Sequence, residues 1–556
     1  MKNYQLLHLF FLLYFFFFFK ICNANIKHKS KHKNKTNKAV NKYIQKNTKE
    51  KLSQRKLVEE LPFRPLSIYL DMEEFIDSFP PALNDYKDNY LNAFENAKNI
   101  LEDFLEIQAD IITPNGKRIK DSLINYVLNN YGITHFTVVF TNDYLSVIDY
   151  NFYILAKFTA EIGEESASVI LDDFSGIPLV GIVLFNENIE SLDKTKLTED
   201  YLTTLMLHHF IRLLGFNAEL SAVGYGNYLP YDVENGVYYL KTEGDSNFTN
   251  VINYARKYFN CPYIDRIDLY VDDENLDEFD DYYEYCNNEI IGLYWPKRLF
   301  LGELLTKFDY PEEQVLSGFT LAFLDDLPYL RVTKNYTGGS LKFGKNKGCE
   351  FFYNHCGNSS NSPSTFANEF FLPNDSLIIS NPSCSSGRLS KTIYKLEPIE
   401  SDTENDINTL FFFNHKAGDK STNYCPIAQF DNSLPNRFIY NGRCSEEEKT
   451  DKNSGRNEVL GKNSFCVLSS LEINDNSISS DTEPDILSLC YEMYCSPKSL
   501  TIKIGEYYLV CPREGGKIKA EFFKGYLLCP DYYLICASSH LCNNLLDCLA
   551  LNSTEK

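Results

Sequence analysis

The sequence predicts an α+β fold with a cysteine-rich, β-rich C-terminal domain. Over residues 61–347, strand-like and helix-like hydrophobic patterns alternate along the chain, which is typical of helices packed on a sheet. Beyond residue 348 the cysteines concentrate in a turn-rich region of short alternating runs, which is typical of small strands held by disulfides. A chain of 556 residues is also too long for one core, so several domains are expected.

The elements of the N-terminal half can be read in order. Structure is expected to begin near residue 61, where Leu66, Ile68 and Leu70 alternate as in a strand. The hydrophobic periods then predict a helix over 85–108, a strand over 135–149, a helix over 151–163 and a strand over 177–188.

The stretch LMLHHFIRLLGFNAEL contains the next helix, which is predicted over 199–214. Thr198 is a suitable N-cap, and Gly215 is a suitable residue to end the helix. At about 100° per residue, four polar side chains share one narrow face of a helix that is otherwise apolar: Tyr201, Thr204, His208 and Arg212. A polar stripe on a buried helix is expected to face a cleft or a partner.

Later elements are predicted in the same way. Helices are expected in VINYARKYFNC and FTLAFLDDLPYL, and an acidic loop, DDENLDEFDDYYEYC, lies between them. The last part of the chain shows short alternating strands with a hairpin turn at Gly515 and Gly516. It is therefore predicted to be a small disulfide-stapled β-domain.

The N-terminus has the features of a secretory signal. Lys2 precedes an apolar run over 9–19, and the small residues Cys22 and Ala24 offer a cleavage point. The alternative is an uncleaved anchor, but about 20 apolar residues are needed to span a bilayer and the run is shorter. The mature protein is expected to be secreted or extracellular, with peripheral cell-surface association allowed and no transmembrane anchor.

The composition supports an oxidising compartment and a glycosylated product. Fifteen of the 16 cysteines follow the cleavage point, so one is left over, and Cys286 is the predicted odd thiol. Eight are disulfide candidates: Cys261, Cys349, Cys356, Cys490, Cys495, Cys511, Cys529 and Cys536. Six Asn-x-Ser/Thr sequons fit passage through a secretory pathway: Asn34, Asn247, Asn335, Asn358, Asn374 and Asn552.

Charge and pattern together divide the chain. The net charge of -22 disfavours nucleic acid as a partner, although the segment over 26–56 is rich in Lys. The predicted division is a signal peptide (1–24), a Lys-rich pro-segment or linker (25–60), an N-terminal subdomain with the helix described above (61–220), a central subdomain (221–347) and the Cys-rich domain (348–556).

The helix has the register of a zinc-peptidase motif. In His-Glu-x-x-His, two His one turn apart chelate zinc and the Glu activates the metal-bound water. The chain resembles the leishmanolysin family of metzincin-like metallopeptidases, whose helix reads His-Glu-x-x-His-x-x-Gly-Phe. The resemblance spans about 62–548 and includes FRPLSIYLD, SGIPLVGIVLFN, ARKYFNC, SLKFGKNKGCEFFYNHC and GLYWPKRLFLGELLT, which holds the only Trp. It implies a metzincin-like zinc-peptidase fold with a central α/β region.

The resemblance also implies a degenerate site. His208 matches the first zinc ligand, Arg212 replaces the second, and Tyr294 replaces the third. His209 stands in place of the catalytic Glu, and Leu305 occupies the Met-turn position. Zinc is expected for the family, but these substitutions predict that it is not bound here. The implied protein is a pseudopeptidase that acts by binding a protein or extended peptide in the former substrate cleft, or by cell adhesion.

Other interpretations remain open. An active zinc metalloendopeptidase would need a rebuilt site that combines His208 with distant ligands such as His135 or His355. A cell-surface structural protein would use its Cys-rich half. His209 has a purely structural reading as a packed core histidine, and Arg212 has one as the partner of a buried carboxylate.

The acidic loop has the spacing of a calcium-binding loop but lacks the Gly that its turn needs. Oxygen-bearing side chains fall at the ligand positions: Asp273, Asn275, Asp277, Asp281 and Glu284. Glu278 stands where the Gly is required, so a solvated surface loop is the favoured interpretation.

Overall fold

The computed structural model describes residues 62–108, 151–159, 166–171, 178–186, 197–216, 229–232, 237–242, 247–271, 293–307, 314–333, 341–354, 380–395, 456–461, 463–473 and 484–536. It also describes a few isolated positions between 356 and 451. The predicted signal peptide, the Lys-rich segment, the strand over 135–149 and the acidic loop with Cys286 lie outside these residues.

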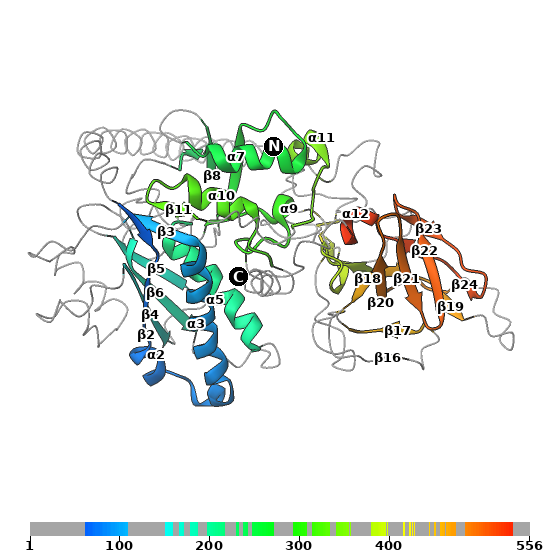
Figure 1. The fold of residues 1–556 in the computed structure, drawn as a ribbon, viewed down its shortest axis with the longest axis horizontal. Helices are drawn as coiled ribbons and strands as arrows, with labels where there is room; N and C mark the ends of the chain where they lie inside the picture. Colours follow the sequence, from blue (N-terminus) through cyan, green and yellow to red (C-terminus); the bar gives the residue numbers. More distant parts are fainter. Residues whose placement is uncertain are drawn as a thin grey trace, which may run out of the picture. The chain divides into compact units, whose positions relative to one another are not determined.

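A four-stranded sheet forms the base of the N-terminal part (Figure 1). Its order is β2-β4-β6-β5, in which β2, β4 and β6 are parallel and β5 is the antiparallel edge strand. The strands are β2 (Ile68–Asp71), β4 (Phe152–Thr159), β5 (Ser166–Leu171) and β6 (Pro178–Asn186). The strands predicted around Ile68 and over 177–188 are confirmed as β2 and β6.

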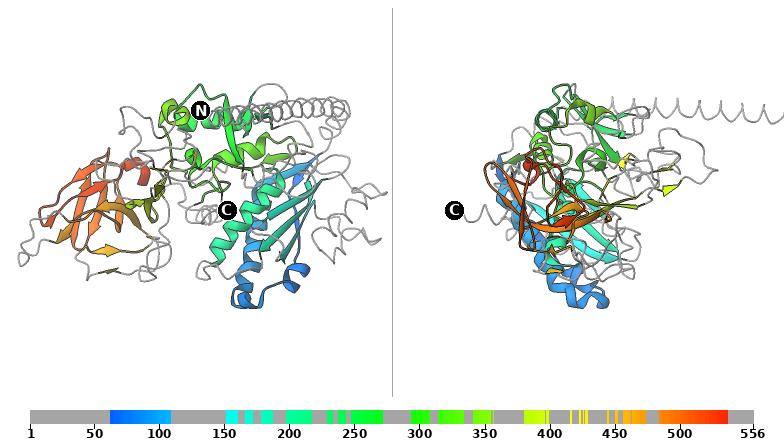
Figure 2. Two further views of the ribbon diagram at one scale, coloured as in Figure 1. Left: turned by 180° about the vertical axis from the view of Figure 1, so that it is seen from behind. Right: turned by 90° about the vertical axis from the view of Figure 1, so that its right-hand side faces the viewer.

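Two long helices, α3 (Lys87–Phe104) and α5 (Glu199–Leu214), lie side by side on one face of this sheet (Figures 1 and 2). The short helix α2 (Glu73–Asp77) and the 3-10 turn η1 (Pro81–Tyr86) close one end. Aromatic side chains from α2, β4 and β6 form a core here, in which the ring of Phe158 is 5.2 Å from that of Phe75 and 5.3 Å from that of Phe185.

Two predictions about this region were wrong in type or length. The segment predicted as a helix over 151–163 contains strand β4, because a strand covered on both faces is a continuous apolar run with no period of two to distinguish it from a buried helix. The helix predicted over 85–108 ends at Phe104, and Leu105–Gln108 forms β3. Strand β3 pairs with β1 (Phe63–Pro65) and β11 (Leu330–Val332).

The central part combines a second sheet with short helices. The sheet has the order β10-β9-β8-β7 and is antiparallel. Its strands are β7 (Tyr231–Asp232), β8 (Val237–Lys241), β9 (Arg266–Val271) and β10 (Leu293–Tyr294). The helices are α7 (Thr249–Phe259), α9 (Lys297–Phe300), α10 (Gly318–Asp326) and α11 (Gly348–Tyr353). Helices α7 and α10 confirm the two helices predicted here.

The C-terminal part is β-rich, as predicted. Its six-stranded sheet has the order β22-β21-β20-β18-β25-β23. These strands are β18 (Ser464–Ser469), β20 (Leu487–Cys495), β21 (Leu500–Ile504), β22 (Tyr507–Cys511), β23 (Gly516–Ile518) and β25 (Leu527–Cys529). The smaller elements are β12 (Ser380–Cys384), β13 (Lys391–Lys395), β14 (Glu397–Pro398), β15 (His415–Lys416), β16 (Thr450–Asp451), β17 (Glu458–Val459), β19 (Glu472–Ile473), β24 (Phe523–Lys524) and α12 (Tyr532–Ile535).

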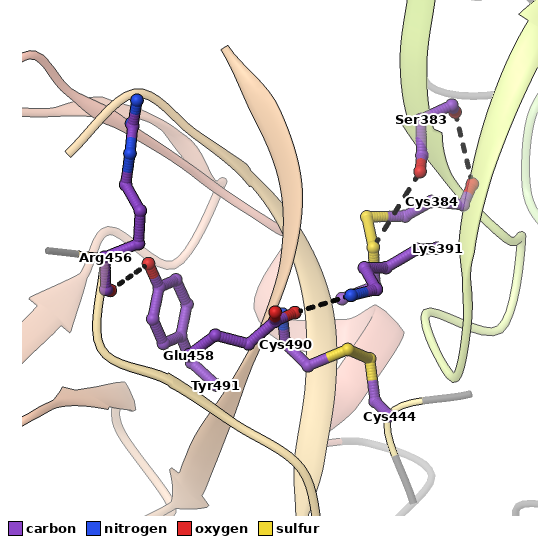
Figure 3. Close-up of polar contacts among 9 residues, drawn as sticks. Ser383, Cys384, Lys391, Cys444, Arg456, Glu458, Cys490 and Tyr491 are labelled. Carbon is purple, nitrogen blue, oxygen red and sulfur yellow. Dashed lines mark hydrogen bonds and ion pairs between the residues drawn. A yellow bond between two sulfur atoms is a disulfide. The ribbon is translucent and has the colours of Figure 1, made fainter. Parts of the chain in front are cut away.

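Six disulfides hold the described chain together. They are Cys261–Cys349, Cys356–Cys425, Cys384–Cys466, Cys444–Cys490, Cys495–Cys536 and Cys511–Cys529. All eight candidate cysteines are among them. Beside the Cys444–Cys490 disulfide, the Glu458 carboxylate accepts hydrogen bonds from the Lys391 ammonium and the backbone N–H of Cys490, each at 2.9 Å (Figure 3). The Lys391–Glu458 ion pair is mostly buried. Glu458 of β17 thereby links Lys391 of β13 to the backbone of β20.

The hairpin predicted at Gly515 and Gly516 does not form. Strand β22 pairs with β21, whereas β23 pairs with β25 at the other edge of the sheet. The two glycines carry the chain between those edges, and a Cβ on Gly515 would lie 2.7 Å from the carbonyl oxygen of Cys529. Glycine is therefore needed here for close backbone approach as well as for its positive φ.

Candidate functional site

Helix α5 has the predicted bounds because both of its ends are specified locally and by tertiary contacts. Thr198 Oγ1 accepts a hydrogen bond from the Tyr201 N–H at 3.3 Å, which is a side-chain N-cap. Glu199 in the first turn accepts from Asn92 and Asn96 of α3. At the other end a Cβ on Gly215 would lie 2.3 Å from the Leu327 side chain.

Close packing fixes the height of α5 above the sheet. Gly181 of β6 lies under Leu213, and a Cβ at that position would be 2.5 Å from Leu213 Cδ1. Nearly the whole helix is buried, including His208, His209 and Arg212 at 2%, 3% and 5% exposure. The polar face predicted from the sequence is therefore enclosed by protein.

His208 is oriented by the loop after α9. Its Nδ1 lies 2.8 Å from the carbonyl oxygen of Leu304, and because a carbonyl only accepts, Nδ1 carries the proton and donates. Burial, followed by the charges of Arg212 and His209, holds the pKa of His208 well below its usual range. The imidazole is thus neutral with its lone pair on Nε2, the arrangement that a metal-binding histidine needs.

Tyr294 and Arg212 meet at His208. The Tyr294 ring is stacked on the His208 ring at 6.0 Å and 28°. The Arg212 guanidinium carbon lies 5.1 Å from the centre of the same Tyr294 ring, within range of a cation–π contact. The structure therefore brings together the three residues that the sequence predicted at the ligand positions. They form a stack of imidazole, phenol and guanidinium.

His209 packs edge-on against His208, with the ring centres 5.6 Å apart, and its ring also reaches the aromatic core. Its ring contacts Phe185 of β6 edge-on at 6.2 Å. Burial, with a smaller contribution from Arg212, lowers the pKa of His209 to about 3. A general base works best when its pKa is near the working pH, and the pKa of His209 is far below that range. The contacts favour the structural reading of His209 as a packed core histidine.

The floor of the site is a tight loop that holds Leu305, the residue at the Met-turn position. Leu305 is fully buried, and its carbonyl accepts from the backbone N–H of Trp295 at 2.8 Å. This bond ties the loop to the residue after Tyr294. Leu304, whose carbonyl orients His208, is its neighbour, so the loop positions two of the three residues in the stack.

Sequence reasoning missed Glu303, the buried carboxylate that organises this floor. Its oxygens accept four hydrogen bonds: from the backbone N–H of Leu305 at 2.5 Å, the N–H and hydroxyl of Ser317 at 3.3 and 3.0 Å, and the hydroxyl of Thr320 at 2.5 Å. Thr320 in turn accepts from the indole N–H of Trp295 at 3.0 Å. A single acidic residue inside the apolar run LFLGELLT was the available signal.

Glu303 makes stability depend on pH. Burial raises the pKa of Glu303 from 4.5 to about 7, against the lowering effect of its hydrogen bonds. A raised folded-state pKa gives a contribution that is complete below pH 4.5 and is lost as pH rises through 7. The difference corresponds to about 3 kcal/mol.

We therefore expect the free energy of unfolding of the unsubstituted protein to fall by about 2.5 kcal/mol relative to Glu303→Gln between pH 5 and pH 8. Denaturant titrations followed by Trp295 fluorescence measure both chains. Histidine protonation affects both equally and cancels in the difference. A difference that stays constant over this range would contradict the assignment.

The residues at the three ligand positions do not fit a zinc ion. Zinc takes imidazole, thiolate or carboxylate donors, and His208 is the one such side chain of the three. A guanidinium only donates hydrogen bonds, and a single positive charge about 4 Å from a dication costs about 8 kcal/mol at an effective dielectric near 20. Within the described residues no group of three His, Cys, Asp or Glu is arranged to hold a metal.

The fold and the register of α5 define a zinc-peptidase scaffold whose ligand positions have been exchanged. The chain belongs to the leishmanolysin family of zinc-dependent metallopeptidases, because the model of that family matches residues 170–543, more than half of the chain. The match begins later than the resemblance expected from residue 62. No curated protein matches the chain.

The ligands of the alternative, rebuilt site lie outside the described residues. His135 and His355 are both in this category, so the rebuilt site stays a prediction. The proposed five-domain division also stays a prediction, although strand β11 from the predicted central subdomain pairs with β3 of the N-terminal one.

Proposed function

We propose that this chain is a secreted pseudopeptidase: it uses the scaffold of a leishmanolysin-family metalloendopeptidase to bind an extended polypeptide, at a cell surface or in solution, without cleaving it. The observation that carries the proposal is the stack of His208, Tyr294 and Arg212. It puts a guanidinium and a phenol at two of the three ligand positions of the family motif, on a helix with the register of that motif. Loss of the chemistry with retention of the scaffold favours binding over catalysis.

Strand β5 offers a place for an extended chain. It is the antiparallel edge of the N-terminal sheet, and α5 packs against both β5 and β6. Edge strands present backbone N–H and C=O groups to which a polypeptide can add as a further strand. Among the described residues, β5 pairs with β6 alone, which supports a peptide as the ligand.

A secreted location is supported by the cysteine chemistry. Twelve cysteines form the six disulfides, and such bonds persist in oxidising compartments. None of the described helices is both long and apolar enough to cross a bilayer.

The test combines metal content with peptide fate. After dialysis of the secreted protein, elemental mass spectrometry is expected to find far less than one zinc per chain. Unstructured peptides labelled for fluorescence anisotropy should bind equally well with and without a chelator, and mass spectrometry should recover them intact. About one zinc per chain, together with cleavage that the chelator stops, would establish the rebuilt metalloendopeptidase instead.

A further inference from the structure

We propose that Asn247 carries an N-linked glycan. This modification site is independent of the zinc-peptidase scaffold and rests on the proposed secreted location. Of the six sequons in the chain, Asn247-Phe248-Thr249 is the one within the described residues, and its geometry favours modification in three ways.

The sequon is presented to solvent by a buried anchor. Asn247 and Thr249 are exposed on either side of Phe248, which is fully buried. The Phe248 ring is stacked on that of Phe323 at 5.4 Å and 12°, and its backbone N–H donates to the carbonyl of Lys241 at 3.0 Å. Because the middle residue is fixed, the acceptor amide and the hydroxyl stay at the surface of the folded protein.

The two functional groups of the sequon are in contact. The Thr249 hydroxyl donates a hydrogen bond to Asn247 Oδ1. The bond uses the oxygen of the Asn247 amide, whereas a glycan is attached to its nitrogen. A glycan on Nδ2 therefore keeps this contact in the folded state.

A glycan on Asn247 also costs helix α7 nothing. An Asn just before a helix commonly serves as its N-cap. In α7 the N-cap position is held by Phe248, which makes no side-chain cap hydrogen bond. The first backbone N–H groups of α7, from Asn250 and Val251, instead donate to the two carboxylate oxygens of Asp326, each at 3.0 Å. The hydrogen bonds that cap the N-terminus of α7 therefore come from Asp326 of α10, and a glycan on Asn247 leaves them in place.

The transfer needs a lipid-linked oligosaccharide as the donor. A bond forms between Asn247 Nδ2 and the anomeric carbon of the first sugar, and the bond from that carbon to the lipid pyrophosphate oxygen breaks. The amide loses one proton, and the lipid pyrophosphate leaves.

The experiment expresses the full chain in eukaryotic cells behind a signal peptide of known efficiency, so that entry into the secretory pathway does not depend on its own signal. The secreted protein is treated with a peptide amidase in heavy-oxygen water, which converts each glycosylated Asn to a labelled Asp. We expect the label at Asn247 in most molecules. A secreted protein whose Asn247 is unlabelled overturns the proposal and leaves the proposed function untouched.

Matched variants separate the glycan from folding. Asn247→Gln and Thr249→Ala should each remove one glycan in a gel-mobility assay, and Thr249→Ser should keep it. After enzymatic deglycosylation of both proteins, Asn247→Gln should change the denaturant midpoint less than Asp326→Asn, because Asp326 accepts from two backbone N–H groups of α7. A mobility that is the same for Asn247→Gln and the unsubstituted protein also overturns the proposal.

Discussion

Replacing Arg212 and Tyr294 together by His is expected to give the chain about one tightly bound zinc ion per molecule. His208 already has the required tautomer, because its Nδ1 donates to Leu304. Tyr294 is stacked on its ring, and Arg212, one turn later on the same helix, lies over the Tyr294 ring. The double substitution removes a repelling charge and supplies two imidazoles, which gives the three-His ligand set that suits catalytic zinc.

The expected gain in zinc affinity is more than about 100-fold, since a change in the groups that only support a ligand already costs 10- to 100-fold. Isothermal titration and elemental mass spectrometry measure it. The control is Arg212→Met with Tyr294→Phe, which removes the charge and the hydroxyl but adds no ligand. If the control binds zinc as tightly as the double-His protein, other residues hold the metal and the present ligand assignment is wrong.

Zinc alone is not expected to restore full peptidase activity. His209 occupies the position of the general base, and loss of such a base costs about 10² to 10⁴ in rate. Its ring is packed against Phe185 in the core, so a Glu placed there would be partly directed into apolar surroundings. In the proposed pseudopeptidase, zinc binding and catalysis are therefore lost through different residues.

The parts of the fold that could be predicted from the sequence are those with local signals. Helix α5 has an N-cap residue, a terminal Gly and an apolar period, and its predicted bounds are confirmed. Strand β4 has no such signal, since both its faces are covered and its run of apolar residues suits either structure. The path at Gly515 depends on which strands β22 and β23 pair with, and pairing over that distance leaves no local trace.

The site shows the same distinction. His208, Arg212 and Tyr294 were identified because they fall at fixed positions in a family motif, and the structure brings them into contact. Glu303 was missed because its importance comes from Ser317 and Thr320, which are distant in the chain and donate to it only after folding. Glu303 holds the loop in place because it is buried and accepts four hydrogen bonds. The burial of a single acidic residue cannot be predicted from its position in the sequence alone.

Arg298→Met is expected to lower the free energy of unfolding by about 3 kcal/mol or more, because each buried carbonyl left without a donor costs about 1 to 3 kcal/mol. The Arg298 guanidinium is buried and donates to the carbonyls of Phe351 at 2.7 Å and Phe352 at 3.3 Å, and to that of Asn354. Phe351 and Phe352 are in the last turn of α11, where carbonyls have no partner within the helix, and Asn354 is the residue that follows the helix. Burial lowers the pKa of Arg298 to about 10, so the side chain remains charged at neutral pH.

Trp295 fluorescence is a suitable probe for Arg298→Met, because the only Trp in the chain is fully buried and its ring lies 5.0 Å from that of Phe300 in α9. Arg298→Lys should give an intermediate loss, since an ammonium lacks the planar fork that serves several carbonyls at once. The matched control is Arg331→Met. Arg331 is 54% exposed and pairs with Glu106 at 3.4 Å, so its loss should cost less than about 1 kcal/mol. Equal losses at the two positions would mean that the carbonyls of α11 find other donors, and that Arg298 acts through its charge rather than as the C-terminal cap of that helix.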